Sequence, residues 1–143
     1  MRGTTNVPEV SIIIRKGDKI LFILRKNTGW SDGMYCMPSG HVEDGEKFST
    51  AAVRESMEEV GLTIEEMRPV HVTQRISSSE DVRLGLFFEA TKWKGTPQNR
   101  EPDKHGEIVW FDKDALPLEN IVQFQADALQ AIQKGKIYSE LGW

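Results

Sequence analysis

Residues 40–62 have the sequence GHVEDGEKFSTAAVRESMEEVGL, the densest pattern in the chain. Residues 48–60 within it contain neither Gly nor Pro and predict a helix that stops at Gly61. Spacings of i, i+3 and i+4 place three carboxylates on one face of this helix: Glu55, Glu58 and Glu59. The opposite face is expected to pack into the protein through three apolar side chains: Val53, Met57 and Val60.

The three carboxylates have two interpretations. Acidic residues on a helix usually form a solvated face, and that interpretation stays open. Against it, Glu55 and Glu59 are like charges at i, i+4, which repel by a few tenths of a kcal/mol unless a cation lies between them. In addition, Phe48, Ala51 and Ala52 continue the same stripe toward the N-terminus, so water alone does not surround it. Clustered carboxylates favour a hard divalent cation such as Mg²⁺, Mn²⁺ or Ca²⁺.

The whole stretch resembles the signature of the Nudix hydrolases, of the MutT-like kind. All fixed positions of that signature are present at the required spacing: Gly40, Glu46, Arg54, Glu55, Glu58, Glu59 and Gly61. Two neighbouring positions depart from the usual pattern, because Ser56 replaces an aliphatic residue and Ser39 replaces a frequent Gly. We expect Ser56 to lie between the apolar and acidic stripes. Neither departure removes a carboxylate.

The resemblance implies an α+β fold, the Nudix α/β/α sandwich. A mixed central sheet would lie between the signature helix and a C-terminal helix, in a single domain over residues 1–143. The residues around the signature agree with this fold. Short β-branched and aromatic runs predict five strands: Val10–Ile14, Ile20–Leu24, Val70–Ile76, Val82–Thr91 and Glu107–Phe111. Asn120 is a suitable N-cap for the last helix, which should end at Gly135.

The resemblance also implies roles for individual residues. Glu55, Glu58 and Glu59 would hold Mg²⁺, with Mn²⁺ as an alternative, aided by the Ser39 carbonyl, and Glu55 or Glu58 would orient or deprotonate the attacking water. Arg54 and Glu46 would pair and brace the loop against the helix; an ordinary surface ion pair is the alternative. Glu101 is a further candidate ligand or base, favoured over Glu107; a loop-surface Glu is the alternative.

The implied function is Mg²⁺-dependent hydrolysis of a diphosphate linkage in a nucleoside diphosphate joined to another group. A nucleoside triphosphate, cleaved to monophosphate and pyrophosphate, is the favoured substrate. The alternative is a non-catalytic nucleotide-binding regulator of the same fold; the retained signature acids favour the enzyme. A structural domain with a fortuitous acidic helix is a third interpretation.

Composition limits the other possibilities. The chain has 143 residues and a formal net charge of −4, which argues against sequence-independent nucleic-acid binding. A single cysteine, Cys36, cannot form an internal disulfide. From the polar N-terminus we expect no targeting signal, and no apolar run is long enough to span a membrane. We therefore expect a cytoplasmic protein with a small nucleotide substrate and no membrane partner; an oligomer is compatible with the sequence.

Several other side chains have both a functional and an ordinary interpretation. Four cations could meet phosphates or remain solvated surface charges: Arg25, Arg75, Arg83 and Lys104. Three aromatic residues could stack on a base or belong to the core: Trp30, Tyr35 and Phe88. His41 and His71 show no metal-site spacing with Cys36 or His105 and are assigned no ligand role.

Overall fold

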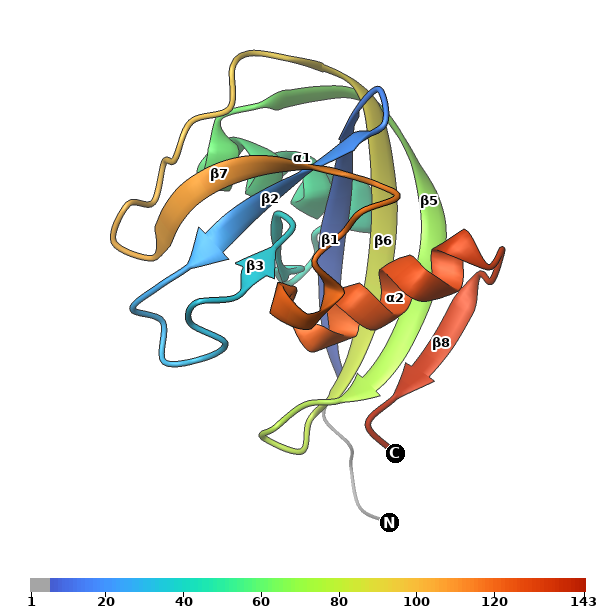
Figure 1. Cartoon of the computed structure of the whole chain (residues 1–143). Coiled ribbons are helices and arrows are strands. Elements are labelled where there is room, and N and C mark those ends of the chain that lie inside the picture. The colour runs from blue at the N-terminus through green and yellow to red at the C-terminus, as the bar shows by residue number, and fades with distance from the viewer. Residues whose placement is uncertain (1–5) are drawn as a thin grey trace.

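A mixed β-sheet between two helices forms the centre of the molecule (Figure 1). The computed structural model describes residues 6–143; Met1–Thr5, part of the N-terminal stretch expected to lack a targeting signal, lie outside that range. The elements in chain order are β1 Asn6–Lys16, β2 Lys19–Arg25, β3 Tyr35–Cys36, β4 Ser39–His41, α1 Phe48–Val60, β5 Thr63–Ile76, β6 Val82–Lys94, β7 His105–Asp112, the 3₁₀ turn η1 Leu118–Asn120, α2 Gln123–Gln133 and β8 Tyr138–Leu141. All five predicted strands and both predicted helices are present.

The sheet is mixed because two of its pairings are parallel. The main strand order is β3-β2-β1-β6-β5-β8, while β4 pairs with β1 and β7 pairs with β2. Strands β1 and β6 run parallel, with Val10 opposite Leu86, and β8 runs parallel to β5. The remaining pairs are antiparallel, including the predicted hairpin of β1 and β2. The α+β sandwich with a mixed central sheet is therefore confirmed.

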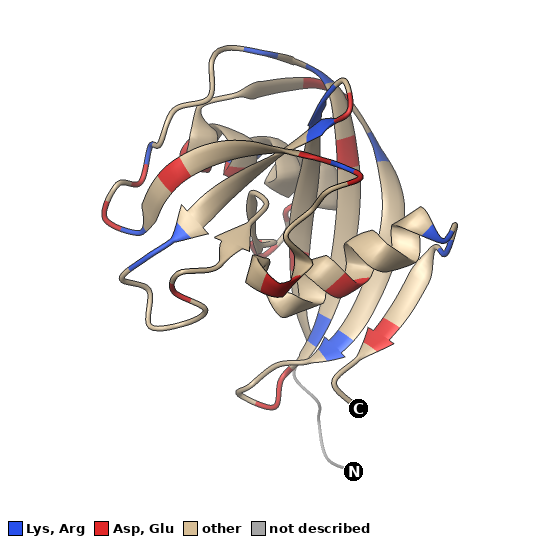
Figure 2. Ribbon diagram, in the orientation of Figure 1, with Lys and Arg blue, Asp and Glu red and all other residues tan. Residues whose placement is uncertain are grey.

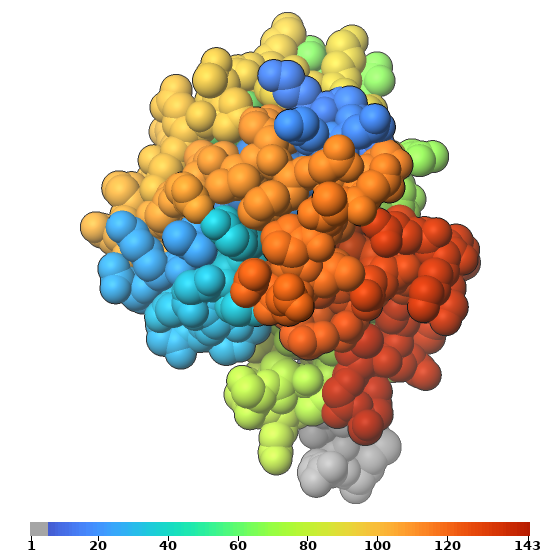
Figure 3. Space-filling model, in the orientation of Figure 1, coloured from blue at the N-terminus to red at the C-terminus, as the bar shows by residue number. Residues whose placement is uncertain are grey.

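Strand β1 is covered on both faces, which explains its continuous apolar sequence. Ile12 and Ile14 belong to a core cluster that also contains residues of α1, whereas the intervening Ile13 belongs to a second cluster with residues of α2. In the view of Figure 1, α2 lies in front of the sheet and α1 behind it. Figure 3 shows the segment from η1 to β8 covering much of the near face.

The buried face of α1 differs from the one predicted. Val60 is buried as expected, but Val53 and Met57 are each 38% exposed, so their assignment to the core face was wrong. The helix instead buries Ala51, Ala52, Ser56 and Glu59. Small side chains allow the helix to approach the sheet closely, and this rotates the acidic stripe inward. Ser56 is fully buried rather than between the stripes, and its hydroxyl donates a 2.9 Å hydrogen bond to the Ala52 carbonyl.

The ends of the helices show one prediction confirmed and one wrong. Gly61 ends α1 in the left-handed conformation, with φ of 70°, and its N–H donates to the Met57 carbonyl. Asn120 is not the N-cap of α2, because it belongs to η1 and the helix starts only at Gln123. Between the turn and the helix, Val122 N–H donates to the Tyr35 carbonyl, which ties the segment to β3.

Charged side chains are spread over the ribbon with both signs interspersed (Figure 2). No helix within residues 6–143 combines the length and the apolar composition that crossing a bilayer requires. Three strands were not predicted: β3, β4 and the edge strand β8. Of these, β4 matters most for the site, because its pairing with β1 places Ser39 and Gly40 beside α1.

Candidate active site

A cavity of about 690 Å³ lies where α1, β4 and the loop before β7 meet. The predicted acids line it together with residues for which the sequence suggested no place in a metal site. The lining residues are Arg25, Asn27, Thr28, Ser39, Gly40, His41, Glu43, Arg54, Glu55, Glu58, Glu59, Glu101, Lys104 and His105. The structure therefore brings all five residues expected around the metal into one cavity.

Glu59 is the most deeply placed of the acids. Its residue exposure is 9%, and its carboxylate accepts a 2.9 Å hydrogen bond from the Ser39 backbone N–H. Burial, followed by the nearby charge of Glu55, raises the pKa of Glu59 well above its ordinary value. A carboxylate in this position gains strongly from a neighbouring cation.

Glu55 lies one turn earlier on the same inward face, with its side chain 12% exposed. The backbone of Gly40 passes directly against the Glu55 carboxylate, so a Cβ atom at position 40 would overlap it. Burial raises the pKa of Glu55, while the guanidinium of Arg54 opposes that shift. Glu58 is on the flank of the helix and is 52% exposed.

Arg54 joins the loop to the helix. Its guanidinium holds Glu46 through two hydrogen bonds, Nε to Oε2 at 2.8 Å and Nη2 to Oε1 at 3.0 Å. It also donates to the His41 carbonyl at 3.0 Å, to Glu55 at 2.9 Å and to Glu58 at 3.2 Å. The hydrogen bonds from Arg54 lower the pKa of Glu46 to about 2. The expected pair is present and fixes the loop onto the acidic face.

Glu101, from the loop before β7, and His105, the first residue of β7, complete the cluster. One ligand atom from each of Glu59, Glu101 and His105 lies within 4.8 Å of the others. The loop is held there because Gln98 N–H donates to the Val60 carbonyl and Arg100 N–H to the Glu59 carbonyl. His105 was assigned no role from the sequence, and no short-range spacing indicated one, because the residues before it form a loop. Glu107 lies apart and accepts a 2.6 Å hydrogen bond from the Tyr35 hydroxyl.

These side chains fit a divalent cation. His105 Nδ1 is buried and, within residues 6–143, has no hydrogen-bond partner. Burial also lowers the pKa of His105, which favours the neutral ring that can ligate a metal. The oxygens of the two carboxylates, one of them buried, suit Mg²⁺ or Mn²⁺, whereas the partnerless imidazole nitrogen beside them favours a softer divalent ion than Mg²⁺.

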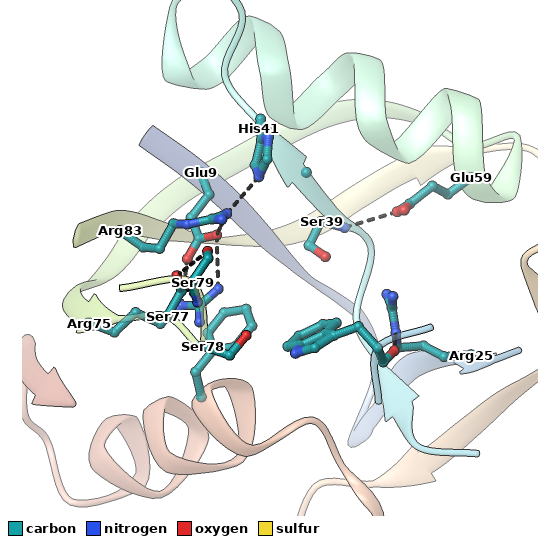
Figure 4. A pocket seen from close by; sticks show the side chains of 13 residues that line it. Glu9, Arg25, Ser39, His41, Glu59, Arg75, Ser77, Ser78, Ser79 and Arg83 are labelled. Carbon is teal, nitrogen blue, oxygen red and sulfur yellow. Dashed lines mark hydrogen bonds and ion pairs between the residues drawn. The ribbon is translucent and has the colours of Figure 1, made fainter. Parts of the chain in front are cut away.

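A second cavity, of about 370 Å³, adjoins the first (Figure 4). The two share Arg25, Ser39, Gly40, His41 and Glu59. Three of the four cations considered from the sequence line the second cavity, Arg25, Arg75 and Arg83, whereas Lys104 lines only the first. Among the aromatic candidates, Trp30 lines the second cavity and Phe88 is in the core.

The fold and the site together define a class: a small α/β/α hydrolase scaffold with an acidic cluster on its first helix. The chain belongs to the Nudix hydrolase family, since the NUDIX domain matches residues 5–132. A MutT NUDIX hydrolase from Burkholderia pseudomallei has a similar structure, with a TM-score of 0.81, 27% identity and coverage of 88% of this chain and 97% of that one. The E. coli ORF135 protein is also similar, with a TM-score of 0.79, 25% identity and coverage of 92% and 91%.

Curated relatives are longer than this chain. The NAD-capped RNA hydrolase NudC of Chromobacterium violaceum is 31% identical over 110 residues, which cover 77% of this chain but 39% of that protein. The same-named protein of Pseudomonas aeruginosa is 29% identical over 110 residues, 77% and 37% of the two chains. The chain thus spans about two-fifths of the length of these curated relatives.

Proposed function

We propose that this protein hydrolyses the diphosphate linkage of a nucleoside diphosphate joined to another group, with Mg²⁺ as its metal. The observation that carries the proposal is the convergence of Glu55, Glu59, Glu101 and His105 in one cavity, with Glu59 buried. An acidic cavity repels a polyphosphate, so this arrangement suits such a substrate only when cations are bound as well.

The metal ligands would be Glu55, Glu58, Glu59, Glu101 and the Ser39 carbonyl, to which we add His105. A bound divalent cation would supply charge neutralisation of the phosphate oxygens, polarisation of the phosphorus and acidification of water. Glu59 is kept in place by the Ser39 N–H, and Arg54 positions Glu55 and Glu58 through direct hydrogen bonds.

The proton acceptor for the attacking water is Glu55 or Glu58. The raised pKa of Glu55, caused by its burial, favours Glu55, because a base with a higher pKa takes the proton more readily. Glu58 is half exposed and hydrogen-bonded to Arg54, so its carboxylate is better suited to binding the metal ion than to accepting a proton. Lys104, which lines the cavity, can meet a phosphate oxygen.

Nucleoside triphosphates are the favoured substrates, giving monophosphate and pyrophosphate. The preference rests on the resemblance to small, MutT-like members of the family; a MutT NUDIX hydrolase of similar structure is covered over 97% of its chain. The NudC relatives, named for NAD-capped RNA, support the wider class in which a diphosphate joins a nucleoside to a second group. Both fit a site that needs two adjacent phosphates and a metal.

The experiment is hydrolysis of a panel of nucleoside triphosphates, NAD and dinucleoside polyphosphates with Mg²⁺ in ¹⁸O-labelled water. We expect monophosphate and pyrophosphate from triphosphates, with the label in a phosphoryl product. Label on a sugar hydroxyl, or efficient release of orthophosphate from nucleoside monophosphates, would contradict the proposal. Tight nucleotide binding without any turnover would favour the regulator instead.

A further inference from the structure

The second cavity ends in a group of charged side chains that the hydrolytic site does not use. Figure 4 shows Glu9, Arg75 and Arg83 together at one end, Glu59 and Arg25 at the other, and Ser39 between them. Glu9 comes from β1, Arg75 from β5 and Arg83 from β6, so the sheet pairing gathers residues far apart in the chain. A substrate with its phosphates at the acidic cluster would place its attached group at this end.

Glu9 is a buried carboxylate with unused acceptor capacity. Its residue exposure is 6%, and Arg75 holds it with two hydrogen bonds, Nε to Oε1 at 2.9 Å and Nη2 to Oε2 at 3.2 Å. Each carboxylate oxygen can accept more than one hydrogen bond, so a free lone pair remains beside the cavity. Gly85 lies next to Glu9 and Thr73, where a Cβ atom would overlap the Thr73 hydroxyl.

Arg83 places hydrogen-bond donors beside that acceptor. Its Nη1 lies 3.8 Å from Glu9 Oε2 and donates to His41 Nε2 at 2.7 Å. Its Nε is buried and, within residues 6–143, has no hydrogen-bond partner. The end of the cavity therefore offers an acceptor and a charged donor side by side, both desolvated. Desolvated polar groups discriminate strongly between ligands that pair with them and ligands that do not.

Two aromatic side chains line the same cavity, Trp30 and Phe124, with ring centroids 6.5 Å apart. Each ring already has a guanidinium against it: Arg25 lies 4.7 Å from the Trp30 centroid and Arg75 lies 3.9 Å from the Phe124 centroid. Cations over aromatic rings hold those rings in place. Such a wall suits a planar aromatic ring, which stacks on it with little cost in conformational entropy.

We infer that Glu9 and Arg83 are the residues that select the group attached to the diphosphate, a planar ring whose edge carries an N–H donor next to a carbonyl oxygen or ring nitrogen. Glu9 accepts from the N–H and Arg83 donates to its neighbour. A nucleobase and the carboxamide of a nicotinamide both have this edge. The inference rests on the proposed function for the position of the phosphates.

A second phosphate is a poorer occupant of this end of the cavity. The buried Glu9 carboxylate would face its oxygens, and both guanidiniums are already partly neutralised by Glu9 and by Asp81, which lies 3.6 Å from Arg83. In a desolvated site, the repulsion between two anions outweighs the stabilisation that the remaining hydrogen-bond donors can provide. A neutral ring edge with both a donor and an acceptor pairs with both side chains.

The test measures the binding of nucleosides in the presence of EDTA. Binding is monitored through the indole N–H signal of Trp30 in two-dimensional NMR spectra, and this signal is assigned by its absence in Trp30→Phe. Nucleosides carry no phosphate, so neither metal nor turnover is involved. We expect adenosine to bind about tenfold more tightly than purine riboside, which lacks only the amino group, because one hydrogen bond to a charged partner is lost. Nicotinamide riboside is compared in the same way with its carboxylate analogue. The two comparisons together identify whether the adenine or the nicotinamide ring is preferred.

Glu9→Gln should reduce the preference for adenosine over purine riboside to less than threefold. A general loss of structure would weaken the binding of both nucleosides equally and leave the ratio of their affinities unchanged. Should Glu9→Gln fail to fold, the wild-type ratio still decides the matter. Equal binding of adenosine and purine riboside, or a Trp30 signal that responds to no ligand, overturns the inference. Such a result alongside normal triphosphate hydrolysis would overturn the inference and leave the proposed function standing. Tighter binding of adenosine than of purine riboside, without hydrolysis of any nucleotide, would support the inference and contradict the proposed function.

Discussion

The buried carboxylate of Glu59 accepts a hydrogen bond from the backbone N–H of Ser39 at 2.9 Å. This contact joins the signature helix to β4, the strand that places Gly40 against Glu55. It fixes the Glu59 carboxylate, one ligand atom of which lies within 4.8 Å of ligand atoms of Glu101 and His105. The helix and the strand therefore position the acids before any ligand arrives, which reduces the cost of binding a cation.

Removal of metal should abolish activity. Turnover of any accepted nucleotide should disappear in EDTA and return with excess Mg²⁺ or Mn²⁺, because the carboxylates cannot approach a polyphosphate alone. Added metal should also raise the melting temperature, since it binds only the folded state. Undiminished turnover in the chelator would overturn the mechanism.

Glu59→Gln should lower kcat by about 100-fold or more while the fold persists. The amide oxygen can still accept the Ser39 hydrogen bond, and removal of a buried charge should leave the metal-free melting temperature unchanged or higher. The metal-induced rise in melting temperature should be lost. Glu66→Gln, at an exposed side chain on β5, is the matched control and should retain full activity and the metal effect.

Gly40→Ala should displace the Glu55 carboxylate, because the added Cβ atom overlaps it. We expect kcat to fall roughly tenfold or more through misplacement of a single group. The same change in a Glu55→Ala background should have little further effect, since the overlap is gone. If the losses in kcat from Gly40→Ala and Glu55→Ala add up in the double variant, Gly40 does not act through Glu55.

Glu46→Gln should break the paired hydrogen bonds to Arg54 and reduce kcat by about tenfold through misplaced ligands. The pair also makes stability depend on pH. Because the pKa of Glu46 is lowered to about 2, its contribution is present above pH ~4.3, the unfolded value, and is lost as the pH falls toward 2. The stability difference between wild type and Glu46→Gln, followed by urea denaturation, should shrink over that interval; a constant difference would contradict this account.

His71 should make the protein less stable as the pH falls below about 6.5. It is buried, with Nδ1 donating to the Lys136 carbonyl at 3.0 Å and Nε2 accepting from the Ser139 hydroxyl at 2.8 Å. Burial lowers the pKa of His71, so over this pH range the unfolded chain binds a proton at His71 and the folded chain does not. Protonation therefore favours the unfolded state. Denaturant unfolding between pH 7.5 and 5 should show this loss, and His71→Gln should reduce it; His105, whose pKa is also lowered, accounts for a further part.

The sequence by itself determined the features that depend on short-range spacing. The length of α1 and its end at Gly61 follow from helix geometry and from residues close in the chain, whereas the pairing of Arg54 with Glu46 was expected only from the family resemblance. The hairpin of β1 and β2 follows from two apolar runs around a turn. The fixed positions of the signature identify the family for the same reason, because its spacing is local.

Only the tertiary structure decided which face of α1 is buried, and with it which acids are desolvated. Periodicity places Val53 and Met57 opposite the acids, but small residues let the helix press its acidic side toward the sheet. His105 joins Glu59 because hydrogen bonds tie the loop before β7 to the end of α1. Glu9, Arg75 and Arg83 meet only because β1 pairs with β6 and β6 with β5. Such contacts depend on strand register and packing between segments far apart in the chain, which no local pattern encodes.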